Sequence, residues 1–98
     1  MKYCFDIDGT ICTNTSGKYR LAVAIPERIA HIQELIRKGH EVSFFTARGS
    51  TTGTDWREVT TNQLVEWGIV NPVIFFGKPE ADLFVDDKAT NSEEYNWG

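Results

Sequence analysis

Residues 5–10 read Phe-Asp-Ile-Asp-Gly-Thr, and the fold prediction depends on this stretch. The preceding residues 2–5 contain Tyr, Cys and Phe and predict a short strand. In an extended segment, side chains two positions apart leave the same face, so Asp6 and Asp8 point one way and Ile7 points into a core. Two neighbouring carboxylates repel each other unless a cation lies close by. The pair therefore indicates a hard metal ion and an anionic ligand.

A second interpretation of the same stretch stays open at this point. Asp8-Gly9 between apolar residues is also a strong β-hairpin signal. Under the first interpretation, Gly9 instead permits a tight turn in which the main chain can approach an anion closely. The rest of the chain decides between the two.

The remaining sequence alternates helix and strand patterns. Apolar spacing and end signals predict helices over 26–38 and about 56–67, the second capped by Asp55. Apolar runs predict strands over 41–45, 73–76 and 83–85, the middle one buried on both faces. Residues 11–25 predict either a small β-flap or an irregular loop that lies over the aspartates.

This order predicts one α/β domain over 1–98, a parallel sheet with helices on both faces. Ligands of such sheets bind outside the carboxyl ends of the strands. Polar side chains follow all four predicted strands at that end: Asp6, Asp8, Thr46, Lys78, Asp86 and Asp87. A hairpin at residues 8–9 does not explain this concordance, so we favour the parallel sheet.

Composition excludes several classes of protein. A net charge of −4 argues against a nucleic-acid surface, which needs a basic patch. The sequence has no run of 18 apolar residues and no visible signal peptide, so we expect neither a membrane span nor secretion. Cys4 and Cys12 fit no zinc spacing, and we expect free thiols in the cytoplasm.

These residues resemble the motifs of the haloacid dehalogenase superfamily of phosphoryl-transfer enzymes. DIDGT at 6–10 resembles the first motif, Thr46 the second, Lys78 the third and VDD at 85–87 the fourth. The resemblance covers residues 2 to 88. The TARG and FGKP stretches are similar to small phosphatases linked to bacterial capsule polysaccharide biosynthesis. The resemblance implies a three-layer Rossmann-like fold without a cap domain, so a second copy of the chain could cover the site.

The resemblance also implies roles for individual residues. Asp6 would be the nucleophile that forms an aspartyl phosphate, and Asp8 the general acid and base. Thr46 would bind a phosphoryl oxygen together with the main-chain N–H of Ala47. Lys78 would contact both the nucleophile and the phosphoryl group.

The metal and substrate roles follow from the same resemblance. Mg²⁺ would be held by Asp6, the carbonyl of Asp8 and Asp87, while Asp86 would hold a metal-bound water or Lys78. Arg48 is either a contact to the substrate's phosphate or sugar, or a loop charge. We expect a Mg²⁺-dependent phosphomonoesterase acting on a small phosphorylated sugar or related metabolite. The alternatives are a receiver-like module and a degenerate member that binds phosphate esters without turnover.

Overall fold

The computed structural model describes residues 1–50, 52–76, 83–85 and 95–97, the range 83–85 by its backbone only. Every predicted helix and strand is present, with each end within one residue of its expected position. The elements in chain order are β1 (Lys2–Asp6), the short 3₁₀ helix η1 (Tyr19–Leu21), α1 (Pro26–Arg37), β2 (Glu41–Phe45), α2 (Arg57–Glu66), β3 (Ile74–Phe75) and β4 (Leu83–Val85).

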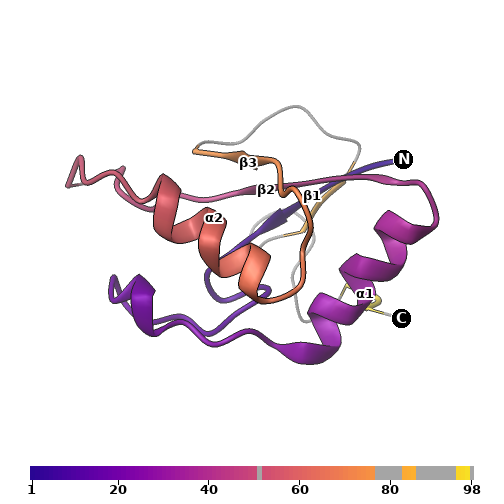
Figure 1. The fold of residues 1–98 in the computed structure, drawn as a ribbon, viewed down its shortest axis with the longest axis horizontal. Coiled ribbons are helices and arrows are strands. Elements are labelled where there is room, and N and C mark those ends of the chain that lie inside the picture. Colours follow the sequence, from indigo (N-terminus) through magenta and orange to yellow (C-terminus); the bar gives the residue numbers. More distant parts are fainter. Residues whose placement is uncertain (51, 77–82, 86–94, 98) are drawn as a thin grey trace.

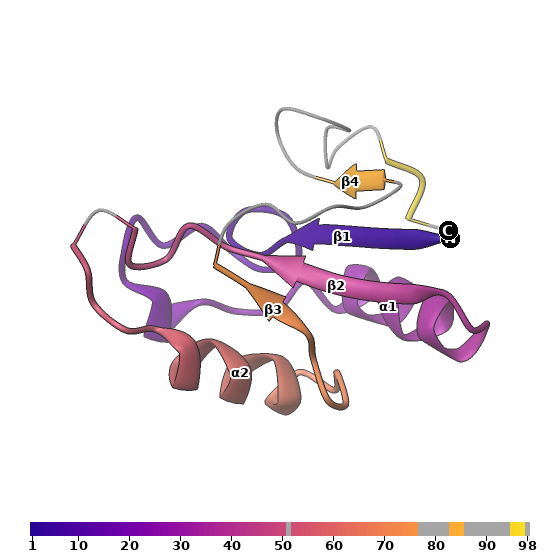
Figure 2. The same ribbon diagram turned by 90° about the horizontal axis from the view of Figure 1, so that it is seen from above.

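The four strands form one parallel sheet in the order β3-β2-β1-β4. Figure 2 shows β3 at one edge and β4 at the other, with β1 and β2 between them. Both neighbours of β1 run parallel to it, so the hairpin interpretation of residues 8–9 is wrong. In this order the chain leaves β1 toward β2 on one side and returns to β4 on the other. The carboxyl end of β1 therefore lies at a topological switch point.

Both helices cover the same face of the sheet (Figure 1). Phe5 on β1 and Phe44 on β2 are paired in register and form one buried cluster with Ile32 of α1 and Leu64 of α2. The steps from β1 to β2 and from β2 to β3 run in the same direction across the sheet, and right-handed crossovers then place both helices on one side. The expected helices on both faces are thus not seen in the described part of the chain.

The sequence predicts that Ile29, Ile32 and Ile36 form the apolar stripe of helix α1, with Leu35 beside them, but Ile36 is 42% exposed in the structure. Ile29, Ile32 and Leu35 are buried against the sheet, and Pro26 occupies the first turn, where its missing N–H costs no hydrogen bond. Helix α2 buries only Thr60 and Leu64. One polar hydroxyl therefore lies on the buried face of α2, close to the carboxyl ends of the strands.

The strand β3 differs from its prediction. We expected this apolar run to be buried on both faces, but Val73 is 52% exposed and Phe75 is 42% exposed. The reason is its position, because among the described strands β3 pairs with β2 and with no other, and so forms an edge of the sheet. Within the described ranges, no helix combines the length and apolar character needed to cross a membrane.

Candidate functional site

The turn after β1 is held by its own main chain. The carbonyl oxygen of Ile7 accepts hydrogen bonds from the N–H groups of Thr10 at 3.1 Å and Ile11 at 3.0 Å. Gly9 has a φ of +79°, in the left-handed region that favours glycine. The Asp6 carboxylate accepts a hydrogen bond from the N–H of Ile7 at 2.9 Å. The turn therefore fixes the main chain that carries both aspartates.

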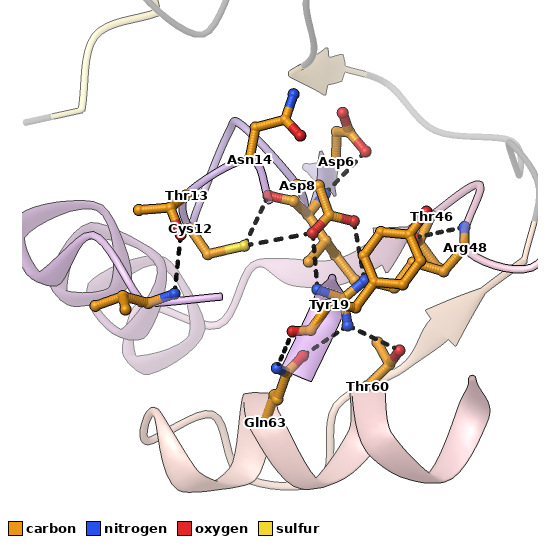
Figure 3. Close-up of polar contacts among 12 residues, drawn as sticks. Asp6, Asp8, Cys12, Thr13, Asn14, Tyr19, Thr46, Arg48, Thr60 and Gln63 are labelled. Carbon is orange, nitrogen blue, oxygen red and sulfur yellow. Dashed lines mark hydrogen bonds and ion pairs between the residues drawn. The ribbon is translucent and has the colours of Figure 1, made fainter. Parts of the chain in front are cut away.

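The Asp8 carboxylate forms a bidentate ion pair with Arg48. Arg48 Nη2 donates to Asp8 Oδ1 at 2.8 Å, and Arg48 Nε donates to Asp8 Oδ2 at 2.9 Å. The Arg48 side chain is 0% exposed and that of Asp8 is 19% exposed. Figure 3 shows the Asp8 carboxylate directed at the guanidinium, while the Asp6 carboxylate points away from it. We expected the carboxylates of Asp6 and Asp8 to face one shared cation. In the structure, the Asp8 carboxylate is already paired with the guanidinium of Arg48.

The buried guanidinium has further partners on α2 and η1. Arg48 Nη1 donates to Thr60 Oγ1 at 3.1 Å and to Gln63 Oε1 at 2.6 Å. The guanidinium carbon lies 4.7 Å from the centre of the Tyr19 ring, within range for a cation–π contact. We call Asp8, Tyr19, Arg48, Thr60 and Gln63 the Arg48 cluster (Figure 3). It joins the loop after β1 to the loop after β2, to α2 and to η1.

Residues 11–25 form a small flap beside this cluster. The N–H of Thr13 donates to the carbonyl oxygen of Val23 at 2.9 Å, and an isolated antiparallel bridge lies next to this bond. The chain between the two sides contains η1. Gln63 Nε2 donates to the carbonyl oxygen of Tyr19 at 2.6 Å and so ties the flap to α2. The β-flap interpretation is confirmed, with a 3₁₀ turn added.

The structure places Thr46 at the carboxyl end of β2, beside β1. Thr46 is 2% exposed, and its Oγ1 accepts a hydrogen bond from the N–H of Arg48 at 3.1 Å. Its own N–H donates to the carbonyl oxygen of Phe75 at 3.0 Å. Ala47 is exposed. The Thr46 hydroxyl therefore shapes the loop that carries Arg48.

An open cavity of about 400 Å³ lies beside Thr46. Its lining combines hydroxyl groups, two aromatic rings and charged groups, among them Thr46, Ser50, Thr54, Trp56, Arg57 and Phe76. A cavity with aromatic walls and hydroxyl groups suits a small polar molecule.

Cys12 contacts the same aspartate from the opposite side. Its Sγ lies 3.5 Å from the carbonyl oxygen of Ile7 and 3.8 Å from Asp8 Oδ1. Burial, with a smaller contribution from the negative charge of Asp8, raises the pKa of the Cys12 thiol to about 12. The thiol is therefore protonated at neutral pH, and Cys12 is not a thiolate nucleophile here. Cys4 is also a buried free thiol, as expected.

The metal prediction rests partly on residues outside the description. Lys78, Asp86 and Asp87 lie outside the described residues. Within the described ranges, no group of three or more His, Cys, Asp or Glu side chains is close enough to hold a metal ion. The carboxylate of Asp6 and the main-chain carbonyl of Asp8 are hard oxygen donors of the kind that Mg²⁺ prefers. The described donors fit part of a Mg²⁺ site, and further ligands are needed to complete it.

Sequence reasoning missed three members of the Arg48 cluster, namely Tyr19, Thr60 and Gln63. Thr60 carried one signal, because it is a hydroxyl residue on the apolar face of the predicted second helix. Gln63 lies three positions further along and shares that side of the helix. Nothing local marked Tyr19, whose role depends on where the flap lies.

Comparison with known proteins adds information on the fold alone. No protein-family model matches the sequence, and no curated protein is significantly similar to it. The structure aligns with the crystal structure of a target protein from Vibrio cholerae with a TM-score of 0.71. The two chains share 24% sequence identity, and the alignment covers 96% of this chain and 86% of the other. This likeness supports a Rossmann-like α/β architecture.

Proposed function

We propose that this chain is a Mg²⁺-dependent phosphomonoesterase of the haloacid dehalogenase type that acts on a small phosphorylated sugar or related metabolite. One observation carries the proposal. Asp6 is the last residue of β1, Asp8 lies two positions beyond it and Thr46 follows β2, and these strands are adjacent and parallel. The three residues therefore lie together at the carboxyl ends of the central strands, at the switch point where such folds bind ligands.

The reaction would proceed in two steps. A carboxylate oxygen of Asp6 attacks phosphorus, a P–O bond to Asp6 forms, and the bond to the leaving oxygen breaks as Asp8 gives that oxygen a proton. A water molecule then attacks phosphorus and passes a proton to Asp8, the bond to Asp6 breaks, and inorganic phosphate leaves. The Thr46 main chain and its neighbour Ala47 would border the phosphoryl group.

The metal would be held by the Asp6 carboxylate and the Asp8 main-chain carbonyl, completed by Asp86 and Asp87. A bound Mg²⁺ supplies neutralisation of the negative charge that the phosphoryl group and the nucleophile bring together. Lys78 would add a second positive charge. The acidic chain, at net charge −4, disfavours polynucleotides as substrates.

One observation favours a second candidate, a module that binds phosphate esters without turnover. Both oxygens of Asp8 already accept hydrogen bonds from Arg48. Proton transfer by Asp8 must therefore use its remaining lone pairs on the 19% of the side chain that is exposed, or break one of these bonds.

The test measures hydrolysis of p-nitrophenyl phosphate with Mg²⁺ and with EDTA. Wild-type protein should turn over with Mg²⁺ only, and Asp6→Asn should abolish turnover while the circular dichroism spectrum is retained. Glu34→Gln removes one carboxylate from the surface of α1 and should leave the rate unchanged. If wild-type protein is inactive but inorganic phosphate raises its melting temperature, the second proposal, a module that binds phosphate esters without turnover, is correct. Hydrolysis by the Asp6→Asn variant would refute the assignment of Asp6 as the nucleophile.

A further inference from the structure

We propose that Arg48 is a positioning residue for Asp8 and does not contact the substrate. This inference rests on the proposed phosphatase function, because the role of Asp8 as proton donor comes from that proposal. It replaces our expectation that Arg48 contacts a substrate phosphate or sugar.

The burial of Arg48 argues against a substrate contact. Its side chain is 0% exposed. The ring of Tyr19 lies over the guanidinium at 4.7 Å, and Thr60, itself 0% exposed, lies on the α2 side. Arg48 borders the open cavity beside Thr46, but its side chain is closed off and the 3% of the residue that is exposed belongs to the main chain. A molecule in this cavity would therefore meet the main chain of Arg48 and not its guanidinium.

The hydrogen-bond geometry explains what Arg48 does instead. Two N–H groups hold both Asp8 oxygens, and two more bind Thr60 and Gln63. A guanidinium has five N–H donors in one rigid plane, so four anchored bonds fix that plane. The Asp8 carboxylate must lie in the same plane to accept both bonds, and its orientation is therefore set by α2 through Arg48.

An oriented Asp8 matters most when the leaving oxygen needs a proton. An alkyl phosphate releases a basic alkoxide unless a proton is supplied, whereas p-nitrophenyl phosphate releases a weakly basic phenolate. Loss of Asp8 orientation should therefore slow the first step for an alkyl phosphate far more than for the aryl ester. A purely structural role, or a substrate contact, does not predict this difference between the rates for the two substrates.

The experiment measures release of the leaving group in the first turnover by rapid quench, with Mg²⁺, for glycerol phosphate and for p-nitrophenyl phosphate. In Arg48→Gln we expect the rate for glycerol phosphate to fall about 10-fold or more beyond the fall for the aryl ester, within the roughly 10²–10⁴-fold that general acid catalysis supplies. Arg48→Lys keeps the charge and one donor and should fall between wild type and Arg48→Gln. Arg37→Gln removes an arginine paired to Glu34 on the surface of α1 and should match wild type for both substrates.

Each other outcome overturns the proposal in a recognisable way. A raised KM with an unchanged first-turnover rate would make Arg48 a substrate contact. Equal falls for both substrates, in both Arg48→Gln and Arg48→Lys, would make its role structural. If wild-type protein releases neither leaving group, the phosphatase proposal fails and this inference fails with it.

Discussion

The pair of Asp8 and Arg48 dominates the site at the scale of single residues. The Arg48 side chain is 0% exposed, and the loss of water around its charge is offset by the ion pair with Asp8 and the hydrogen bonds to Thr60 and Gln63. Removing one partner of a buried ion pair is costly, since the remaining charge stays desolvated without its counter-ion.

Asp8→Asn should therefore destabilise the fold as well as slow any turnover. We expect a loss of about 3–5 kcal/mol in the free energy of unfolding, toward the lower end because the Asn oxygen still accepts one hydrogen bond. Urea denaturation followed by tryptophan fluorescence measures this loss. Glu34→Gln breaks the exposed pair with Arg37 on α1 and serves as the control, with little change expected. Equal midpoints for the two variants would contradict the importance of the buried pair.

At the scale of elements, the loop between β2 and α2 depends on a close approach between two parts of its own main chain, at Gly49 and at Thr54. The N–H of Gly53 donates to the carbonyl oxygen of Gly49 at 2.8 Å. Both glycines have a positive φ, +83° at Gly49 and +74° at Gly53. A Cβ atom at Gly49 would lie 2.2 Å from the carbonyl oxygen of Thr54, whereas one at Gly53 would meet nothing within 4 Å.

This difference makes a matched pair of variants. Gly53→Ala should cost about 1–2 kcal/mol for the left-handed backbone alone. Gly49→Ala should cost more, because the main chain at Thr54 must move, and it should also lower turnover, since the loop carries Arg48. Denaturation midpoints and p-nitrophenyl phosphate rates measure both effects. If the two variants lose the same stability, the close approach at Gly49 does not matter.

At the scale of the whole molecule, the chain is acidic, and the sequence predicts that part of this charge collects at the carboxyl end of the sheet. The chain has 14 acidic and 10 basic residues, a net charge of −4. Six polar residues that follow strand ends include four carboxylates, of which Asp6 and Asp8 are described. A metal that binds this end of the sheet in the folded state only must stabilise the fold by mass action.

Mg²⁺ should therefore raise the melting temperature of metal-free protein. At a concentration 100 times its Kd, the gain is about 2.7 kcal/mol. Asp6→Asn should lose most of this gain, and NaCl at matched ionic strength should not reproduce it. Differential scanning calorimetry after EDTA treatment and dialysis measures the change. A melting curve that stays the same at millimolar Mg²⁺ would contradict the proposed metal site.

The sequence by itself determined the elements, their order and the parallel sheet. Helix α1 was predictable because apolar residues at helical spacing, among them Ile29 and Ile32, repeat within one local segment. The burial of Leu35 in place of the expected Ile36 was decided by how the helix packs. The strands were predictable because each is a short apolar run, and their alternation with helices through crossover connections makes the sheet parallel. The position of Asp6, Asp8 and Thr46 at the carboxyl end of the sheet followed from that topology.

Only the tertiary structure decided what these side chains contact. The guanidinium of Arg48 binds Asp8 across 40 positions of sequence, and Thr60 and Gln63 of α2 bind the same group. No local pattern encodes such a partner, because it depends on strand register, loop path and helix rotation together. The exposed side of β3 has the same kind of cause, since a strand's burial depends on its place in the sheet and not on its own apolar residues.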